Sequence, residues 1–238
     1  MSFTRWRSLV DGTEVDVGST IPDSVVDNFN DVDDPEQPGI YEADDDITDF
    51  YTGGASSFSR TTAESAVGET SLVRSSDDAA AITSLPGTGL KDLNNYVERG
   101  DTVRCWIRRD DTTTPRAGVL FAVSSETGFD NLDCYMARPL PESGIEEFRI
   151  ERFDDGDTTT IAASTLTPTD YPAGEWFEID IEWASNNDIN ATFKGAGGDV
   201  IASANDSTYS ENVGVGFLSN TSTGDAGSLR FDGYEIID

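Results

Sequence analysis

The chain has 238 residues, of which 46 are acidic and 15 basic, so its formal net charge at pH 7 is −31. Phosphate backbones are bound by Lys and Arg patches, so this balance excludes nucleic acid as an expected partner. The absence of histidine excludes Ser–His and Cys–His catalytic pairs and imidazole metal ligands. No apolar run reaches about 18 residues, so no membrane insertion is expected.

The acidic charge indicates a protein adapted to concentrated brine. Like charges at this density repel one another and destabilise a compact state. At about 1 M salt the Debye length falls to about 3 Å, which screens most of that repulsion. An acidic disordered chain would carry a similar charge, but 12 Phe, 7 Tyr and 4 Trp argue for a folded one. We therefore expect a folded protein of an extreme halophile.

Residues 1–38 differ from the rest of the chain. Isolated apolar residues such as Phe3, Trp6 and Leu9 are followed by the acidic text IPDSVVDNFNDVDDPEQPG. The beginning of the segment has no apolar h-region and no cleavage site, so it is not a recognisable signal peptide. We predict an extended N-terminal arm over 1–38 that anchors the protein or drives its oligomerisation. A floppy terminus is the alternative.

Residues 39–238 read as a series of short strands separated by Gly, Asp, Asn and Pro. The expected strands are 57–62, 70–75, 102–109, 117–124, 132–139, 146–153, 159–166, 176–183, 189–195, 200–206, 213–219 and 228–237. Many of them alternate apolar and polar residues. The pattern predicts an all-β fold, an antiparallel sandwich of two sheets. The run Asp154-Asp155-Gly156-Asp157 predicts a hairpin turn, because Asp-Gly tolerates positive φ.

The two cysteines are too few for a disulfide framework. Cys105 and Cys134 each alternate with apolar residues along a predicted strand. We expect them to face inward as small hydrophobic residues. A single disulfide between neighbouring strands is the alternative.

Several short motifs occur in a familiar order along residues 40–237. They are IYEADDDITDFYTGGASSFSR at 40–60, GETSL at 68–72, GDTV at 100–103, AGEWFEIDIEW at 173–183, GVGF at 214–217 and FDGYEI at 231–236. In this order they resemble the concanavalin A-like lectin/glucanase superfamily, in particular its laminin-G-like and carbohydrate-binding modules. The resemblance implies a jelly-roll sandwich of two antiparallel sheets.

The same resemblance implies a structural calcium ion between the first and last strands. Its ligands would be Glu42, Asp232 and a backbone oxygen near Glu69. Hard oxygen ligands of this kind suit calcium. The sequence departs from the family at Gly233, where a second Asp is usual.

A catalytic alternative comes from Glu178, Asp180 and Glu182, which resemble the signature of laminarinase-type glycoside hydrolases. The three carboxylates share one face of a strand. The outer two are about 13 Å apart by strand rise, whereas retaining enzymes hold their carboxyl groups about 5–5.5 Å apart. The chain after Glu182 is also shorter than in that family, and acids on a wet face are ordinary in this composition. We therefore expect no enzyme, and name these three residues as the site only if the chain is one.

Glycan binding is expected on outward aromatic and arginine side chains. Sugar sites stack aromatic rings on the sugar and orient it with planar polar groups. The candidates are Trp106, Arg108 and Tyr135. The alternative is that Trp106 and Tyr135 cover the second sheet or an interface with another subunit.

The chain as a whole resembles structural proteins of haloarchaeal tailed viruses. This resemblance implies a non-catalytic protein of the virion surface, in a turret, fibre or decoration, that recognises host-surface glycans. Its partners would be other virion proteins and copies of itself, since such assemblies are symmetric homo-oligomers. The alternative is a secreted or cell-surface carbohydrate-binding module of a haloarchaeon, and the third is a laminarinase-like glycoside hydrolase.

Overall fold

A computed structural model describes residues 8–10, 13–15, 25–34, 38–76, 80–85, 96–110, 117–124, 129–141, 144–219 and 227–237. These residues form strands and three short 3-10 helices, η1 (Ile47–Asp49), η2 (Ala55–Ser57) and η3 (Phe129–Asn131). No helix within these ranges has the length and apolar character needed to cross a membrane.

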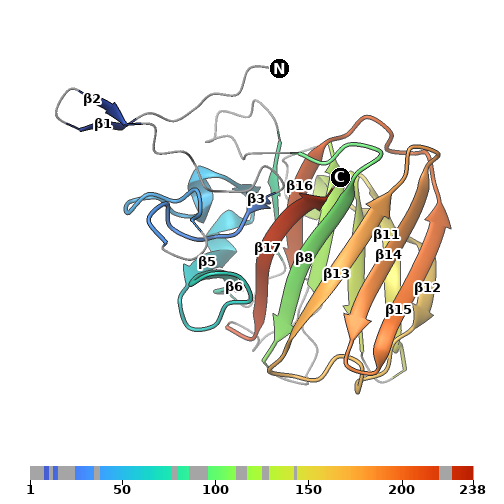
Figure 1. The fold of residues 1–238 in the computed structure, drawn as a ribbon. Helices are drawn as coiled ribbons and strands as arrows, with labels where there is room; N and C mark the ends of the chain where they lie inside the picture. Colours follow the sequence, from blue (N-terminus) through green and yellow to red (C-terminus); the bar gives the residue numbers. More distant parts are fainter. Residues whose placement is uncertain are drawn as a thin grey trace.

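Two antiparallel sheets form a sandwich (Figure 1). The seven-stranded sheet has the order β12 (Asp157–Thr165), β11 (Glu147–Asp154), β10 (Cys134–Leu140), β9 (Ala117–Val123), β16 (Gly214–Ser219), β7 (Ala80–Ser84) and β4 (Thr52–Gly53). The eight-stranded sheet has the order β15 (Gly198–Asn205), β14 (Asp188–Gly195), β13 (Trp176–Trp183), β8 (Thr102–Arg109), β17 (Leu229–Ile237), β6 (Ser71–Arg74) and β5 (Phe58–Thr61), with β3 (Val25–Asp27) paired to β17. A separate hairpin consists of β1 (Ser8–Val10) and β2 (Thr13–Val15).

The last strand joins the beginning of the chain to its middle. In Figure 1, β17 lies between the green strand β8 and the blue and cyan N-terminal segments. It pairs with β8 on one side and with β6 and β3 on the other. A bulge between Asp232 and Glu235 interrupts its pairing with β8.

Buried and half-buried residues alternate along the central strands β8 and β13. In β8, Val103, Cys105 and Ile107 are buried, whereas the residues between them are half-buried. β13 alternates in the same way. Because successive side chains of a strand point to opposite faces, each strand gives one apolar face to the core and one polar face to the outside.

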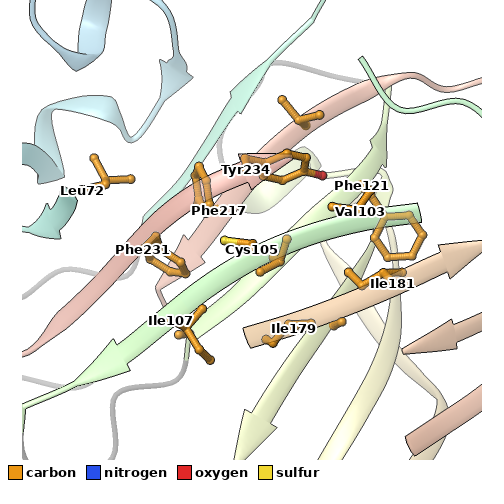
Figure 2. Packing of buried hydrophobic residues seen from close by; sticks show 14 of the residues in the cluster. Leu72, Val103, Cys105, Ile107, Phe121, Ile179, Ile181, Phe217, Phe231 and Tyr234 are labelled. Carbon is orange, nitrogen blue, oxygen red and sulfur yellow. The ribbon is translucent and has the colours of Figure 1, made fainter. Parts of the chain in front are cut away.

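Aromatic side chains fill the space between the sheets (Figure 2). The ring of Phe217 on β16 lies 4.8 Å from that of Phe231 and 5.7 Å from that of Tyr234, both on β17. The hydroxyl of Tyr234 donates to the carbonyl oxygen of Leu120 on β9 at 2.9 Å. Each large apolar side chain buried here stabilises the fold by about 1.5–3 kcal/mol. These contacts therefore hold the two sheets together.

The predicted boundary at residue 38 is wrong, because part of the predicted arm belongs to the sandwich. β3 pairs with β17, and Val26 and Phe29 are fully buried in the core. No alternation of apolar and polar residues could be recognised there, because β3 is only three residues long. An arm distinct from the sandwich can therefore extend no further than residue 24.

Asp27, at the end of β3, lies at the centre of a buried polar cluster. Its carboxylate accepts hydrogen bonds from the hydroxyls of Tyr41 at 2.9 Å and Tyr51 at 3.0 Å. It also accepts one from the backbone N–H of Phe29 at 2.7 Å. Burial raises the pKa of Asp27 to about 6, although these hydrogen bonds act in the opposite direction.

Both cysteines are free and buried, so the disulfide alternative is wrong. Cys105 faces the main core, as predicted. Cys134 belongs to a second apolar cluster with Leu120, Met136 and Leu218. Since its neighbour Tyr135 points into the main core, Cys134 lies on the opposite face of β10 and not between the sheets.

Candidate functional site

The outer face of β8 and β13 gathers most of the residues that the sequence singled out. In the register of these strands, Trp106 lies opposite Glu178, Arg104 opposite Asp180, and Arg108 opposite Trp176. All six side chains are on the polar face, because their neighbours along each strand are buried. We call this surface the Trp106 face.

Ion pairs fix the polar groups of the Trp106 face. Arg104 Nε contacts Glu178 Oε1 at 2.8 Å and Asp180 Oδ1 at 2.9 Å. Lys194 on β14 pairs with the same two carboxylates, at 2.7 Å from Asp180 Oδ2. Burial raises the pKa of Asp180, but hydrogen bonds from Arg104 and Lys194 outweigh it and leave this pKa below its ordinary value.

The three acids of the catalytic alternative are not arranged for acid catalysis. Glu178 and Asp180 are neutralised by Arg104 and Lys194. Glu182 is exposed and accepts a hydrogen bond from Asn190 Nδ2 at 3.3 Å. A glycosidase needs a carboxyl group with a raised pKa that remains protonated. The pKa of Asp180 is instead lowered, because Arg104 and Lys194 donate hydrogen bonds to it.

The indole ring of Trp106 packs over the bulge of β17. Gly233 has a φ of +55°, and a Cβ atom built there would lie 2.8 Å from two ring carbons of Trp106. The guanidinium of Arg104 lies 5.9 Å from the centroid of the Trp106 ring, within cation–π range. Any side chain at position 233 would meet this ring, which favours glycine there.

Arg108 also lies on the Trp106 face but is already paired. Its Nε contacts Asp110 Oδ1 at 2.6 Å and its Nη1 contacts Glu64 Oε2 at 2.8 Å. Trp176, directly opposite Arg108, was missed as a site residue. The alternation WFEIDIEW contained this signal, because it places Trp176 on the same face as Glu178.

The prediction that Tyr135 faces outward is wrong. Its side chain is fully buried and packs against Phe121 and Trp183 between the sheets. Its hydroxyl donates to Asp206 Oδ1 at 2.7 Å and accepts from the N–H of Tyr209 at 3.2 Å. Tyr135 therefore anchors a loop and does not offer its ring to a sugar.

The predicted calcium site named Glu42, Asp232 and a backbone oxygen near Glu69, and the structure places these residues in different surroundings. Glu42 and Glu69 are exposed, whereas Asp232 is fully buried. Within the part of the chain that the structure describes, no group of three or more acidic or cysteine side chains is placed to hold a metal ion. Asp232 Oδ2 instead accepts from the N–H groups of Ala66 and Val67 at 2.6 and 2.8 Å. The segment next to Glu69 therefore lies beside Asp232, and calcium binding stays a prediction.

Solved structures of the same fold match most of this chain. A Bacillus subtilis protein with a galectin-like fold is 12% identical, over 80% of this chain and 89% of that one, with a TM-score of 0.51. The exoplasmic/lumenal domain of VIP36, in a Ca2+/Man3GlcNAc-bound form, is 7% identical over 82% of this chain and 90% of that one, also with a TM-score of 0.51. The fold is a lectin-like jelly roll. The predicted fold class is thereby confirmed.

The carbohydrate-binding module CBM66 from Bacillus subtilis is 15% identical, over 78% of this chain and 94% of that one, with a TM-score of 0.48. No family model and no curated protein matches the chain. At these identities the likeness to solved structures extends to the fold alone.

Proposed function

We propose that this chain is a non-catalytic glycan-recognition module whose binding surface is the Trp106 face. The observation that carries the proposal is the half-buried Trp106 ring beside charged groups that ion pairs already hold in place. Aromatic rings bind the apolar face of a sugar, and oriented planar groups bind its hydroxyls. Because the charged groups are fixed before binding, little conformational entropy is lost when a glycan arrives.

The lectin-like fold is compatible with this proposal. The solved VIP36 domain carries a mannose-containing glycan, so mannose oligosaccharides are the first class to test. The paired state of Glu178 and Asp180 argues against acid catalysis by these residues. The same pairs are well suited to hold carboxylate oxygens toward sugar hydroxyls.

The test is a binding titration with mannose-, glucose- and galactose-containing oligosaccharides in molar salt. Trp106→Ala should weaken binding at least about tenfold, which corresponds to about 1.4 kcal/mol. Trp106→Phe should retain most of the affinity, because a ring remains. Ile201→Ala is the control, since Ile201 is 55% exposed on the same sheet but two strands away from β13. Equal affinities for Trp106→Ala and the native chain would remove this face from consideration.

For the setting of this module we propose the surface of a virion of a halophilic archaeal virus. The charge of −31 supports adaptation to concentrated salt. Residues 1–24 are the segment available for anchoring to other virion proteins or to further copies of the chain. Light scattering in molar salt tests this role. An oligomer that becomes a monomer on removal of residues 1–24 supports it, whereas monomers in both cases favour a free secreted or cell-surface module.

A further inference from the structure

A second candidate site lies at one end of the sandwich, away from the Trp106 face. Here a pocket of about 310 Å³ is lined by Glu98, Arg99, Trp183, Ser210, Glu211, Asn212 and Val213. Trp183 is the last residue of β13 and points inward, whereas the Trp106 face is on the other side of the same strand. Trp106 pairs with Glu178, five residues before Trp183, so the two sites are roughly 16 Å apart along β13.

Trp183 lines this pocket from the side of the core. The side chain is 1% exposed, and its ring meets those of Phe121 and Tyr135 edge-on at 5.9 and 6.4 Å. Its Nε1 has no hydrogen-bond partner. This nitrogen is itself buried, so the polar contacts to a ligand come from the other lining residues.

One wall of the pocket is fixed by the turn before β8. The N–H of Gly100 donates to the carbonyl oxygen of Trp183 at 2.7 Å, and the N–H of Trp183 donates to that of Asp101 at 2.9 Å. Arg99 Nη1 donates to Asn187 Oδ1 at 2.5 Å. The guanidinium of Arg99 is therefore oriented before any ligand binds.

The opposite wall follows a loop that is tied to the other sheet. Asp206 pairs with Arg152 on β11 at 2.7 Å. The hydroxyl of Tyr209 donates to Asp154 Oδ1 at 2.6 Å. These contacts end just before Ser210, so they place the lining residues 210–213 against the turn before β8.

The lining chemistry favours a small neutral polyhydroxyl ligand. Glu98 and Glu211 accept hydrogen bonds, Arg99 donates them, and Ser210 and Asn212 do both. The two carboxylates outnumber the one guanidinium, and the whole chain carries −31, so an anionic ligand is repelled. The volume is at the lower end of the range for ligand pockets, which limits the ligand to one sugar unit.

We propose that this pocket binds a single neutral sugar residue, such as the terminal unit of a glycan. The inference rests on the proposed glycan-recognition function and adds a second subsite to it. A glycan chain then has two contacts on one molecule, with its terminal residue in the pocket and a longer stretch on the Trp106 face.

The test follows the indole N–H signals of the ¹⁵N-labelled full chain in molar salt. The probes are the methyl glycosides of mannose, glucose and galactose, and the Trp183 signal is assigned from a Trp183→Phe variant. We expect a saturable shift of the Trp183 signal and none at Trp106 or Trp176. Glu211→Ala and Asn212→Ala lie in an exposed loop and should weaken binding at least about tenfold. Asp157→Ala, at the exposed first residue of β12, should leave the affinity unchanged.

Other outcomes separate this inference from the proposed function. Oligosaccharide binding that depends on Trp106, with no shift at Trp183 and no effect of Glu211→Ala, overturns the pocket and leaves the Trp106 face intact. Binding of methyl glucuronide as tight as that of methyl glucoside overturns the neutral class. Failure of every oligosaccharide and every methyl glycoside to bind overturns both proposals together.

Discussion

Gly233 shows how one residue fixes the surface around it. Its φ is +55°, and a Cβ atom there would meet the Trp106 ring at 2.8 Å. A non-glycine residue in the left-handed region costs about 1–2 kcal/mol before any clash. We expect Gly233→Ala to destabilise the fold by about 2 kcal/mol or more, measured as a lower urea midpoint in molar salt.

A Trp106→Ala background provides the control for Gly233. There the ring is gone and only the backbone strain remains, so Gly233→Ala should cost less than in the native chain. The same cost in both backgrounds would show that contact with the ring plays no part.

Two buried carboxyl groups predict that stability falls as the pH rises. Burial raises the pKa of Asp232 from 3.8 to about 8, against the lowering effect of its backbone hydrogen bonds. Asp27 is raised from 3.8 to about 6 by the same cause. Between the unfolded and folded pKa values the folded state binds more protons, so each group contributes stability that is fully present below pH 3.8 and is lost as the pH rises through its folded pKa.

We therefore expect the urea midpoint to rise as the pH is lowered from about 8 towards about 4, with at most about 1.4 kcal/mol per pH unit from each group. The series is measured in molar salt, which screens the surface acids. Asp232→Asn should remove the slope above about pH 6 and reduce it below, whereas Asp27→Asn should reduce only the part below about pH 6. Carboxyl groups with lowered pKa values, such as Asp180 and Asp206, lose their contribution only below this window. An unchanged slope in both variants would contradict the assignment.

At the scale of elements, deletion of β3 tests where the sandwich begins. Removal of residues 1–24 leaves β3 in place, whereas removal of 1–38 also removes the buried Val26 and Phe29. The shorter deletion should keep a cooperative transition with a similar midpoint. The longer one should cost at least about 3 kcal/mol, from two buried side chains at about 1.5 kcal/mol or more each. Equal midpoints for both deletions would show that β3 does not support the fold.

The alternation of apolar and polar residues predicted the strands that have one face toward solvent. β8 and β13 occupy the predicted ranges, and the Asp155-Gly156 turn has the two positive φ values that a two-residue hairpin of type I′ requires. β7 was missed because all five of its residues are buried and two of them are Ala, which has a low strand propensity.

The error at Tyr135 has the same origin as the one at β7. Every residue of β10 is buried, so period two separates its two faces but does not tell which of them meets the other sheet. The pocket at Trp183 also could not be predicted from the sequence, because residues 98–99 and 210–213 meet only through pairing of distant strands. The Trp106 face could be predicted from the sequence, since apolar and polar residues alternate along both of its strands, β8 and β13.

At the scale of the whole molecule, the charge of −31 sets the conditions in which the sandwich is stable. Repulsion among 46 acidic side chains acts on the compact state more than on the unfolded chain, in which the charges are farther apart. The Arg and Lys pairs offset this only locally, since exposed pairs contribute about 0–1 kcal/mol each. We expect the thermal midpoint at pH 7 to rise steadily as salt increases from about 0.1 M to about 1 M, while the Debye length falls from about 10 Å to about 3 Å. Sucrose, which stabilises by exclusion from the surface without screening charge, is the control. If the thermal midpoint rises no more in salt than in sucrose, charge repulsion does not limit this fold, and adaptation of the protein to brine is contradicted.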